Sequence, residues 1–211
     1  MENYVITIAR GFGSGGKDIA ERLSKVLQIP CYEKEILTMA SEQSGLSENL
    51  FNLADEKMRG SQLAKLVKKL SHLRASGVEA VEKEFVSDEE LYSIQVEIIK
   101  KLAETQSCII VGKCADYILK NNKNVISLYI EAPRAYCVQS VMDKMQVSKE
   151  RANELIKKTD KYRAEYYKFY TGGNYWTNPV NYDLTLNSDR IGRENCVKII
   201  KAYAKEKFNI G

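Results

Sequence analysis

The fold is decided by a stretch near the amino terminus that reads Tyr4-Val-Ile-Thr-Ile-Ala-Arg10, Gly11-Phe-Gly-Ser-Gly-Gly-Lys17-Asp18 and Ile19-Ala-Glu-Arg-Leu-Ser-Lys-Val-Leu27. An apolar strand runs into a glycine-rich turn, a lysine and a helix. Glycines let the backbone turn its N–H groups toward one point, where the helix N-terminus adds partial positive charge. Lys17 supplies a mobile full charge for the outer phosphates of a ligand. This order predicts that residues 11–19 bind a polyphosphate, and we expect a nucleoside triphosphate.

Asp18 stands where the motif G-x-x-x-x-G-K is normally followed by a serine or threonine. The missing hydroxyl normally ligates Mg²⁺, and an acid beside a phosphate repels it unless a metal intervenes or the side chain points away. We therefore expect Asp18 to bind Mg²⁺ only weakly, through a water molecule. The alternative is that the glycine-rich turn is purely structural and that Asp18 is a favourable residue in the first turn of the helix. The predicted phosphate-binding residues are Gly11, Gly13, Ser14, Gly15, Gly16, Lys17, Asp18 and Ile19.

Composition narrows the class of protein. The chain has 211 residues, 44% of them hydrophobic, which suits one globular domain with a small inserted lobe. No apolar run approaches the roughly 20 residues needed to span a bilayer, and the amino terminus is already strand-like, so we expect a cytoplasmic protein without a membrane partner.

The 5 cysteines form no C-x-x-C pair, and the only histidine is His72, which argues against a disulfide framework and a zinc site. The net charge of +4 is mild, and we expect no nucleic-acid partner.

Alternating strands and helices predict an α/β fold. Strands are expected at 4–9, near 30–33, and at 107–111, 125–130 and 182–187. The first, third and fourth are almost continuously apolar, as strands buried on both faces are, which favours a parallel sheet wrapped by helices. Helices are expected at 34–44, 48–73, 88–105, 134–144, 147–160, 161–170 and 190–207, with a loop at 171–180.

The stretch from 34 to 106 is too long for a simple crossover between strands. Its last helix has a capping box, with Ser87 as N-cap and Glu90 three positions later. One apolar face then follows at helical spacing, consisting of Leu91, Ile94, Ile98 and Leu102. We expect either a substrate-covering lobe or further helices packed on the sheet.

Four segments carry a resemblance to a known family: residues 8–17, 29–36, 110–118 and 160–172. On these segments the chain resembles the cytidylate kinase-like family, a branch of the P-loop nucleoside monophosphate kinases. The resemblance covers nearly the whole chain. It implies a three-layer P-loop fold with a five-stranded parallel sheet, in which residues 1–211 form a single kinase domain. Within that domain it implies a helical acceptor-binding insertion at 34–87 and a lid region at 146–180.

The resemblance also implies an activity, the transfer of the γ-phosphoryl group of ATP to a nucleoside monophosphate, with CMP or dCMP preferred and Mg²⁺ accompanying ATP. Lys17, Asp160 and Arg163 are the implied catalytic residues. The D-x-x-R spacing of Asp160 and Arg163 matches part of the lid motif of cytidylate kinases, in which the arginine reaches the transferring phosphoryl group. The alternative is an i,i+3 surface pair on one helix, worth only a few tenths of a kcal/mol.

Acceptor binding is implied for Tyr32, Glu33 and Lys113. Glu33 stands where family members often have an aspartate, and it could accept from a base amino group or ribose hydroxyl or simply begin a helix. Lys113 replaces an arginine that contacts the acceptor phosphate, or it is a surface lysine. Asp116 could support metal or acceptor binding near Lys113, but we expect it at an exposed helix position. Arg10 could touch phosphate or pair with an acid, and the sequence does not decide.

Two other functions fit the same residues. The altered lid, Lys113 and the aromatic stretch 162–176 fit a kinase with an acceptor other than CMP. Asp18 in place of a hydroxyl fits a nucleotide-binding regulator that transfers nothing. In the kinase readings the partners are ATP and a small anionic acceptor, and the sequence makes no prediction of oligomeric state.

Overall fold

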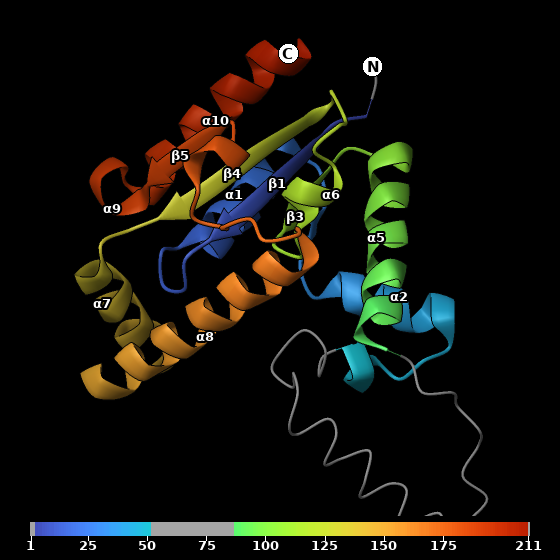
Figure 1. The fold of residues 1–211 in the computed structure, drawn as a ribbon. Coiled ribbons are helices and arrows are strands. Elements are labelled where there is room, and N and C mark those ends of the chain that lie inside the picture. The colour runs from blue at the N-terminus through green and yellow to red at the C-terminus, as the bar shows by residue number, and fades with distance from the viewer. Residues whose placement is uncertain (1–2, 52–86, 211) are drawn as a thin grey trace, which may run out of the picture. The chain divides into compact units, whose positions relative to one another are not determined.

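The computed structural model of the chain describes residues 3–51 and 87–210 (Figure 1). The predicted helix at 48–73 beyond residue 51, His72 and most of the predicted insertion at 34–87 lie outside the described residues. The chain divides into two compact units, one formed by Met1–Glu33 with Ile99–Gly211 and the other by Lys34–Ile98. The second unit begins at the residue where the sequence predicts the insertion to begin.

The first unit is built on a five-stranded sheet with the order β2-β3-β1-β4-β5, in which every pairing is parallel. The strands are β1 (Val5–Arg10), β2 (Cys31–Tyr32), β3 (Cys108–Val111), β4 (Val125–Glu131) and β5 (Leu184–Asn187). The three central strands are almost wholly buried, as continuous apolar runs predict, whereas the edge strands β2 and β5 are only partly buried. The prediction of an α/β fold with a parallel sheet is confirmed.

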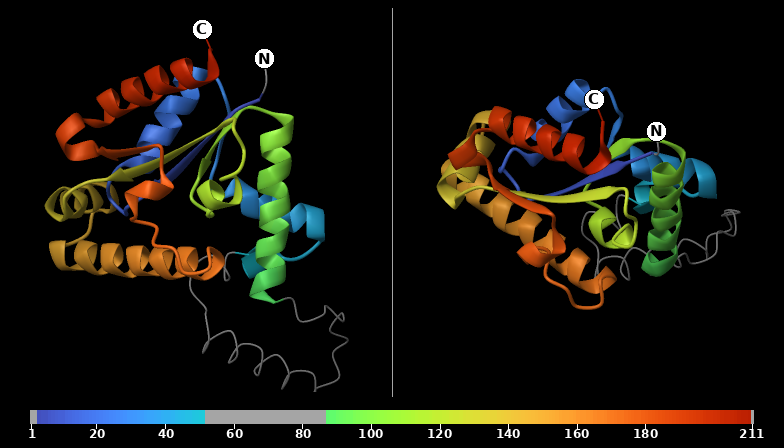
Figure 2. Two further views of the ribbon diagram at one scale, coloured as in Figure 1. Left: turned by 45° about the horizontal axis from the view of Figure 1, so that its top comes forward. Right: turned by 90° about the horizontal axis from the view of Figure 1, so that it is seen from above.

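Helices cover both faces of this sheet and complete three layers (Figure 2). They are α1 (Gly16–Leu27), α6 (Ala115–Ile118), α7 (Arg134–Met145), α8 (Lys149–Tyr170), the 3₁₀ turn η2 (Pro179–Asn181), α9 (Ser188–Ile191) and α10 (Arg193–Phe208). In the view from above, α1 and α10 lie on one face, and α6 and α8 lie on the other. The main core forms between the sheet and the first pair, where Ile6, Ile8, Ile19, Leu23 and Ile200 are fully buried.

Helix α8 is longer than the sequence predicts. Two helices were expected at 147–160 and 161–170, but the chain continues as a single helix of 22 residues because nothing in this stretch breaks it. Ser148 caps its start as predicted, and its hydroxyl accepts a hydrogen bond from the Arg151 N–H at 3.2 Å. Ala152 and Ile156 pack it against α7. The described residues contain no helix long and apolar enough to cross a membrane.

The second unit contains α2 (Glu35–Ser44), and α5 (Asp88–Thr105) begins in it and ends in the first unit. The predicted capping box of α5 is present. Ser87 Oγ accepts from the Glu90 N–H at 3.2 Å, and Glu90 Oε2 accepts from the Ser87 N–H at 2.6 Å. Of the predicted apolar face, Leu91, Ile98 and Leu102 are buried, and Ile94 is half-buried.

Candidate functional site

The glycine-rich segment between β1 and α1 folds into a compact loop. The Gly11 N–H donates to the Ile130 carbonyl at 3.1 Å, which ties the loop to β4. The Ser14 N–H and hydroxyl both donate to the Gly11 carbonyl, at 3.3 and 2.9 Å, and close the turn. Gly13 and Gly15 have φ values of 90° and 82°, a region that side chains disfavour. The loop therefore requires glycine at both positions.

Backbone amides are presented where the loop enters α1. The helix begins at Gly16, and the Ile19 N–H donates to the Gly15 carbonyl at 3.0 Å as the first bond of its ladder. The N–H groups of Gly16, Lys17 and Asp18 come before that ladder, at the N-terminus of the helix. A helix N-terminus favours anions, and this one lies where the sequence predicts a phosphate, whose binding stays a prediction. Ile19 contributes packing only, because its side chain is fully buried and its N–H is already bonded.

Lys17, Arg10 and Glu33 form an ion-pair bridge beside this loop. Glu33 Oε1 lies 2.6 Å from Arg10 Nη2, and Glu33 Oε2 lies 2.7 Å from Lys17 Nζ. Burial pushes the pKa of the Glu33 carboxyl upward, but Arg10 and Lys17 outweigh it, and the net pKa is below its ordinary value. Arg10 therefore pairs with an acid at the carboxyl ends of the strands, which is one of the two roles that the sequence left open.

Asp18 faces two arginines. Its Oδ2 lies 3.0 Å from Arg22 Nε and 3.7 Å from Arg193 Nη1. Arg193 packs so closely on Gly15 that a Cβ there would collide with its guanidinium, and it donates to Tyr136 Oη at 3.0 Å. The cations offset the charge of an acid beside a phosphate site and argue against direct ligation of a metal by Asp18. Sequence reasoning missed Arg193, which is 175 positions from Asp18 and shares no motif with it.

The predicted catalytic pair on α8 contacts the loop. Asp160 Oδ1 accepts from the Phe12 N–H at 2.8 Å, and Arg163 Nη1 donates to the Arg10 carbonyl at 2.9 Å. The two side chains are 3.7 Å apart and mostly buried. Burial raises the pKa of Asp160, although the Phe12 amide and Arg163 oppose it. Because both side chains are mostly buried against the loop, Asp160 and Arg163 are not the solvent-exposed i,i+3 surface pair that the sequence left as an alternative.

Glu131, which ends β4, is a second acid that sequence reasoning missed. Its oxygens accept from Tyr129 Oη at 2.5 Å and from the Ala132 N–H at 2.9 Å. A Cβ at Gly11 would collide with this carboxylate, which places it against the loop. An acid ending a buried strand was the available signal. Within the described part of the chain, no three or more His, Cys, Asp or Glu side chains gather closely enough to hold a metal ion.

The remaining acceptor-binding candidates, Tyr32 and Lys113, lie at the carboxyl ends of the neighbouring strands β2 and β3. Tyr32 ends β2, and its hydroxyl accepts from Gln106 Nε2 at 3.1 Å. Lys113 follows β3 with a left-handed backbone, at φ 59°. Its neighbour Gly112 lies against the Arg10 guanidinium, which a Cβ would strike. The structure brings Tyr32, Glu33 and Lys113 to neighbouring strand ends, and their contact with an acceptor stays a prediction.

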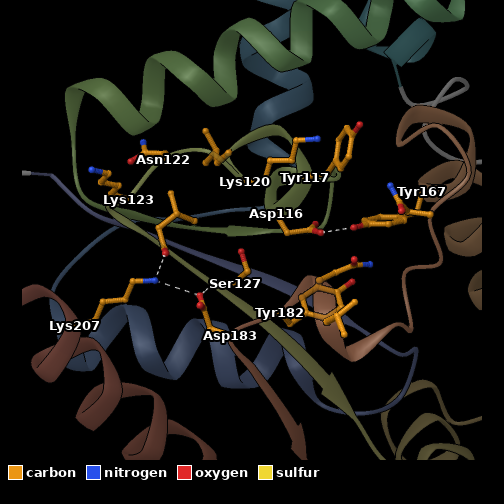
Figure 3. A pocket seen from close by; sticks show the side chains of 15 residues that line it. Asp116, Tyr117, Lys120, Asn122, Lys123, Ser127, Tyr167, Tyr182, Asp183 and Lys207 are labelled. Atoms are coloured by element: carbon orange, nitrogen blue, oxygen red, sulfur yellow. Dashed lines mark hydrogen bonds and ion pairs between the residues drawn. The ribbon is translucent and has the colours of Figure 1, made fainter.

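Asp116 corrects the expectation of an exposed helix position. Its side chain is buried, and it accepts a hydrogen bond from Tyr167 Oη of α8 at 2.7 Å (Figure 3). Burial raises the pKa of Asp116 to about 6, although its hydrogen bonds oppose the shift. Cys114, the residue before the short helix α6, has a left-handed backbone conformation that the sequence does not signal.

Asp116 lines a hollow of about 470 Å³, and its other lining residues include Tyr117, Tyr167 and Lys207 (Figure 3). The first residues of β4 also line the hollow. Lys207, another lining residue, donates to the Val125 carbonyl at 2.7 Å and pairs with Asp183 at 3.4 Å. The glycine-rich loop meets the other end of β4, and none of residues 11–18 lines the hollow. This hollow is therefore separate from the predicted phosphate site.

Comparisons with known proteins bear on the family and the fold of the chain. A model of the cytidylate kinase-like family matches residues 5–190. No curated protein sequence matches the chain. Among solved structures, an uncharacterized protein from Eubacterium ventriosum has a TM-score of 0.68 and 26% identity over 96% of this chain and 99% of its own. Shikimate kinase from Bacteroides thetaiotaomicron has a TM-score of 0.50 and 11% identity over 96% and 98%, a likeness of fold alone.

Proposed function

The chain belongs to the cytidylate kinase-like family, and from that membership we propose that it transfers the γ-phosphoryl group of ATP to a nucleoside monophosphate, with CMP or dCMP as the preferred acceptor. The family and the P-loop kinase fold support a phosphotransferase. The choice of acceptor rests on the resemblance of residues 29–36, 110–118 and 160–172 to cytidylate kinases.

One observation carries the proposal. Cationic groups from three separate elements, Arg10 of β1, Lys17 of α1 and Arg163 of α8, gather around one glycine-rich loop. Arg163 comes from 153 residues away and binds the carbonyl of Arg10, so the tertiary fold brings these cations together. Phosphoryl transfer between two anions needs concentrated positive charge and fixed geometry, and this cluster offers both.

The roles follow from the contacts. Donor phosphates would lie on the amides of residues 16–18 with Lys17 at their outer oxygens, where a helix N-terminus favours anions. Arg163 would face the transferring phosphoryl group, where positive charge is most effective. Asp160, bound to the Phe12 amide, holds α8 against the loop. The acceptor phosphate is already an anion at neutral pH, so no protein base is required.

Mg²⁺ bound with ATP would neutralise charge between the outer phosphates. It would be held mainly by phosphate oxygens and water, with Asp18 reaching it through water. The pairing of Asp18 with Arg22 and Arg193 supports this indirect arrangement.

The proposal is tested by coupled ADP release over a panel of acceptors: CMP, dCMP, UMP, AMP, GMP and shikimate. Wild-type protein is expected to turn over fastest with CMP or dCMP. Lys17→Ala should lose turnover and retain its fold, because it removes the charge from the outer phosphates. Lys25→Ala is the matched control, since Lys25 is exposed near the end of the same helix, and it should retain turnover.

Other results would redirect the assignment. Turnover with a different acceptor would support a related kinase and refute the preference for CMP. Tight ATP binding without turnover of any acceptor would support a nucleotide-binding regulator. Wild-type protein that binds no ATP, or a Lys17→Ala variant with undiminished ATP affinity, would refute the phosphate site itself.

A further inference from the structure

We propose that Arg10 is a second phosphate-binding residue of the site and that Glu33 is an internal substitute for the phosphate, competing with anionic ligands for Arg10 and Lys17. This inference rests on the proposed function only in that residues 11–18 take a phosphate. It assigns Glu33 a role different from reading the base or ribose of an acceptor.

The geometry of the bridge is that of a bound anion. Each carboxylate oxygen of Glu33 has its own cation, with Arg10 at 2.6 Å and Lys17 at 2.7 Å. These are charge-assisted distances, and a phosphate group with two oxygens in the same places would meet the same donors. The carboxylate thus occupies a position in which two cations converge beside the glycine-rich loop.

The two cations, Arg10 and Lys17, differ in burial and therefore in how easily their side chains can move. The side chains of Arg10 and Glu33 are only 15% and 18% exposed, whereas that of Lys17 is 49% exposed. A half-exposed lysine on a flexible stem can leave a carboxylate at little cost, while a largely buried arginine stays in place. Lys17 is therefore the cation that moves between Glu33 and a ligand phosphate.

Arg10 is held where ligands of open α/β sheets bind. It ends β1, its guanidinium lies over Gly112 at the end of β3, and its carbonyl accepts a hydrogen bond from Arg163. Ligands of such sheets bind beyond the carboxyl ends of the strands. A fixed guanidinium there suits phosphate oxygens better than a lysine does, because it presents a planar fork of donors. Arg10 thereby supplies the fork that Lys113 cannot.

Charge explains the competition. Glu33 remains ionised at neutral pH, because Arg10 and Lys17 hold its pKa below the ordinary value despite burial. A phosphate that reaches Lys17 lies within a few ångströms of this carboxylate, and like charges at that distance repel. Glu33 therefore weakens the binding of every phosphate ligand, and removing its charge should strengthen it.

The test is calorimetric titration of inorganic tripolyphosphate into the full chain at low salt. Glu33→Gln should bind about tenfold more tightly than wild type, equivalent to about 1.4 kcal/mol. Glu21→Gln is the matched control, because Glu21 also pairs with Lys17, at 4.0 Å, but is 55% exposed. It should change affinity less than about twofold, since solvent screens an exposed pair. In the double variant Arg10→Gln with Glu33→Gln, the gain should vanish.

A measurement on wild-type protein removes any doubt about folding of the variants. The carboxyl carbon of Glu33, followed by NMR through an acid titration, should show a higher pKa when tripolyphosphate is present, because an anion has replaced part of its cation pairing. An unaltered pKa of Glu33 in the ligand-bound protein would overturn the inference, as would a folded Glu33→Gln variant that binds tripolyphosphate no more tightly.

The two proposals fail differently. If wild type and Glu33→Gln bind neither ATP nor tripolyphosphate, the phosphate site is wrong and both proposals fall. If wild type binds both ligands and Glu33→Gln binds with equal or lower affinity, only the role of Glu33 is wrong. If affinity rises in Glu33→Gln and the rise persists when Arg10 is also replaced, Glu33 acts through Lys17 alone, and Arg10 is not a phosphate ligand.

Discussion

Replacing Asp116 by asparagine should remove a pH dependence from the stability of this protein. Asp116 is buried beside the sheet and accepts a hydrogen bond from Tyr167 Oη at 2.7 Å. Burial disfavours its charged form and raises its pKa to about 6 from an ordinary value of 3.8. Asparagine keeps the shape and the acceptor for Tyr167 but has no charge to bury.

The sign and size follow from proton linkage. Between the two pKa values the folded chain holds the proton on Asp116 and the unfolded chain has lost it, so the folded state binds more protons. The contribution of protonated Asp116 to the free energy of unfolding is therefore full below the unfolded-state pKa of 3.8. It is lost as the pH rises through the folded-state pKa of about 6. The whole change corresponds to about 3 kcal/mol, of which about 1.4 kcal/mol falls between about pH 5 and about pH 7.5.

The assay is urea unfolding of wild type and Asp116→Asn at several pH values in that range. The difference in free energy of unfolding between the two proteins should shift by about 1.4 kcal/mol in favour of the variant as the pH rises. Asp143→Asn is the control, because Asp143 is exposed on α7, and its curve should parallel wild type. Parallel curves for wild type and Asp116→Asn would refute the reasoning and show that Asp116 ionises normally in the fold.

Three further substitutions test the site and its support. Arg163→Ala should lower kcat about a hundredfold or more with little change in KM, because its proposed contact forms mainly in the transition state; an unaltered kcat in steady-state assays would leave Arg163 a structural role only. Arg193→Ala should weaken ATP binding about tenfold by calorimetry, because Asp18 would face the phosphates with less compensating charge; equal affinity would show that Arg22 suffices. Ser148→Ala should lower the free energy of unfolding by about 1 kcal/mol in urea, because the Arg151 N–H loses its acceptor, whereas an unchanged midpoint would mean that the cap is dispensable.

Local chemistry explains why much of the fold could be predicted. The apolar runs that became β1, β3 and β4, the capping box at Ser87 and Glu90, and the cap at Ser148 are short-range signals with short-range consequences. The prediction was wrong at Asp116 and divided α8 in two. The error at Asp116 concerns packing, since a lone acid in the sequence gives no sign that a tyrosine 51 positions away will cover it. The error at α8 is local, since no residue there ends the helix.

By itself, the sequence determined the order of the five strands along the chain, the glycine-rich turn with Lys17, and membership of the family, because these depend on the chemistry of neighbouring residues. Only the tertiary structure decided that Arg10 and Lys17 share Glu33, that Arg193 covers Asp18, and that Asp160 and Arg163 contact the loop. Those pairs join residues separated by up to 175 positions. Their energies depend on distance and burial in the folded chain, which no spacing along the sequence specifies.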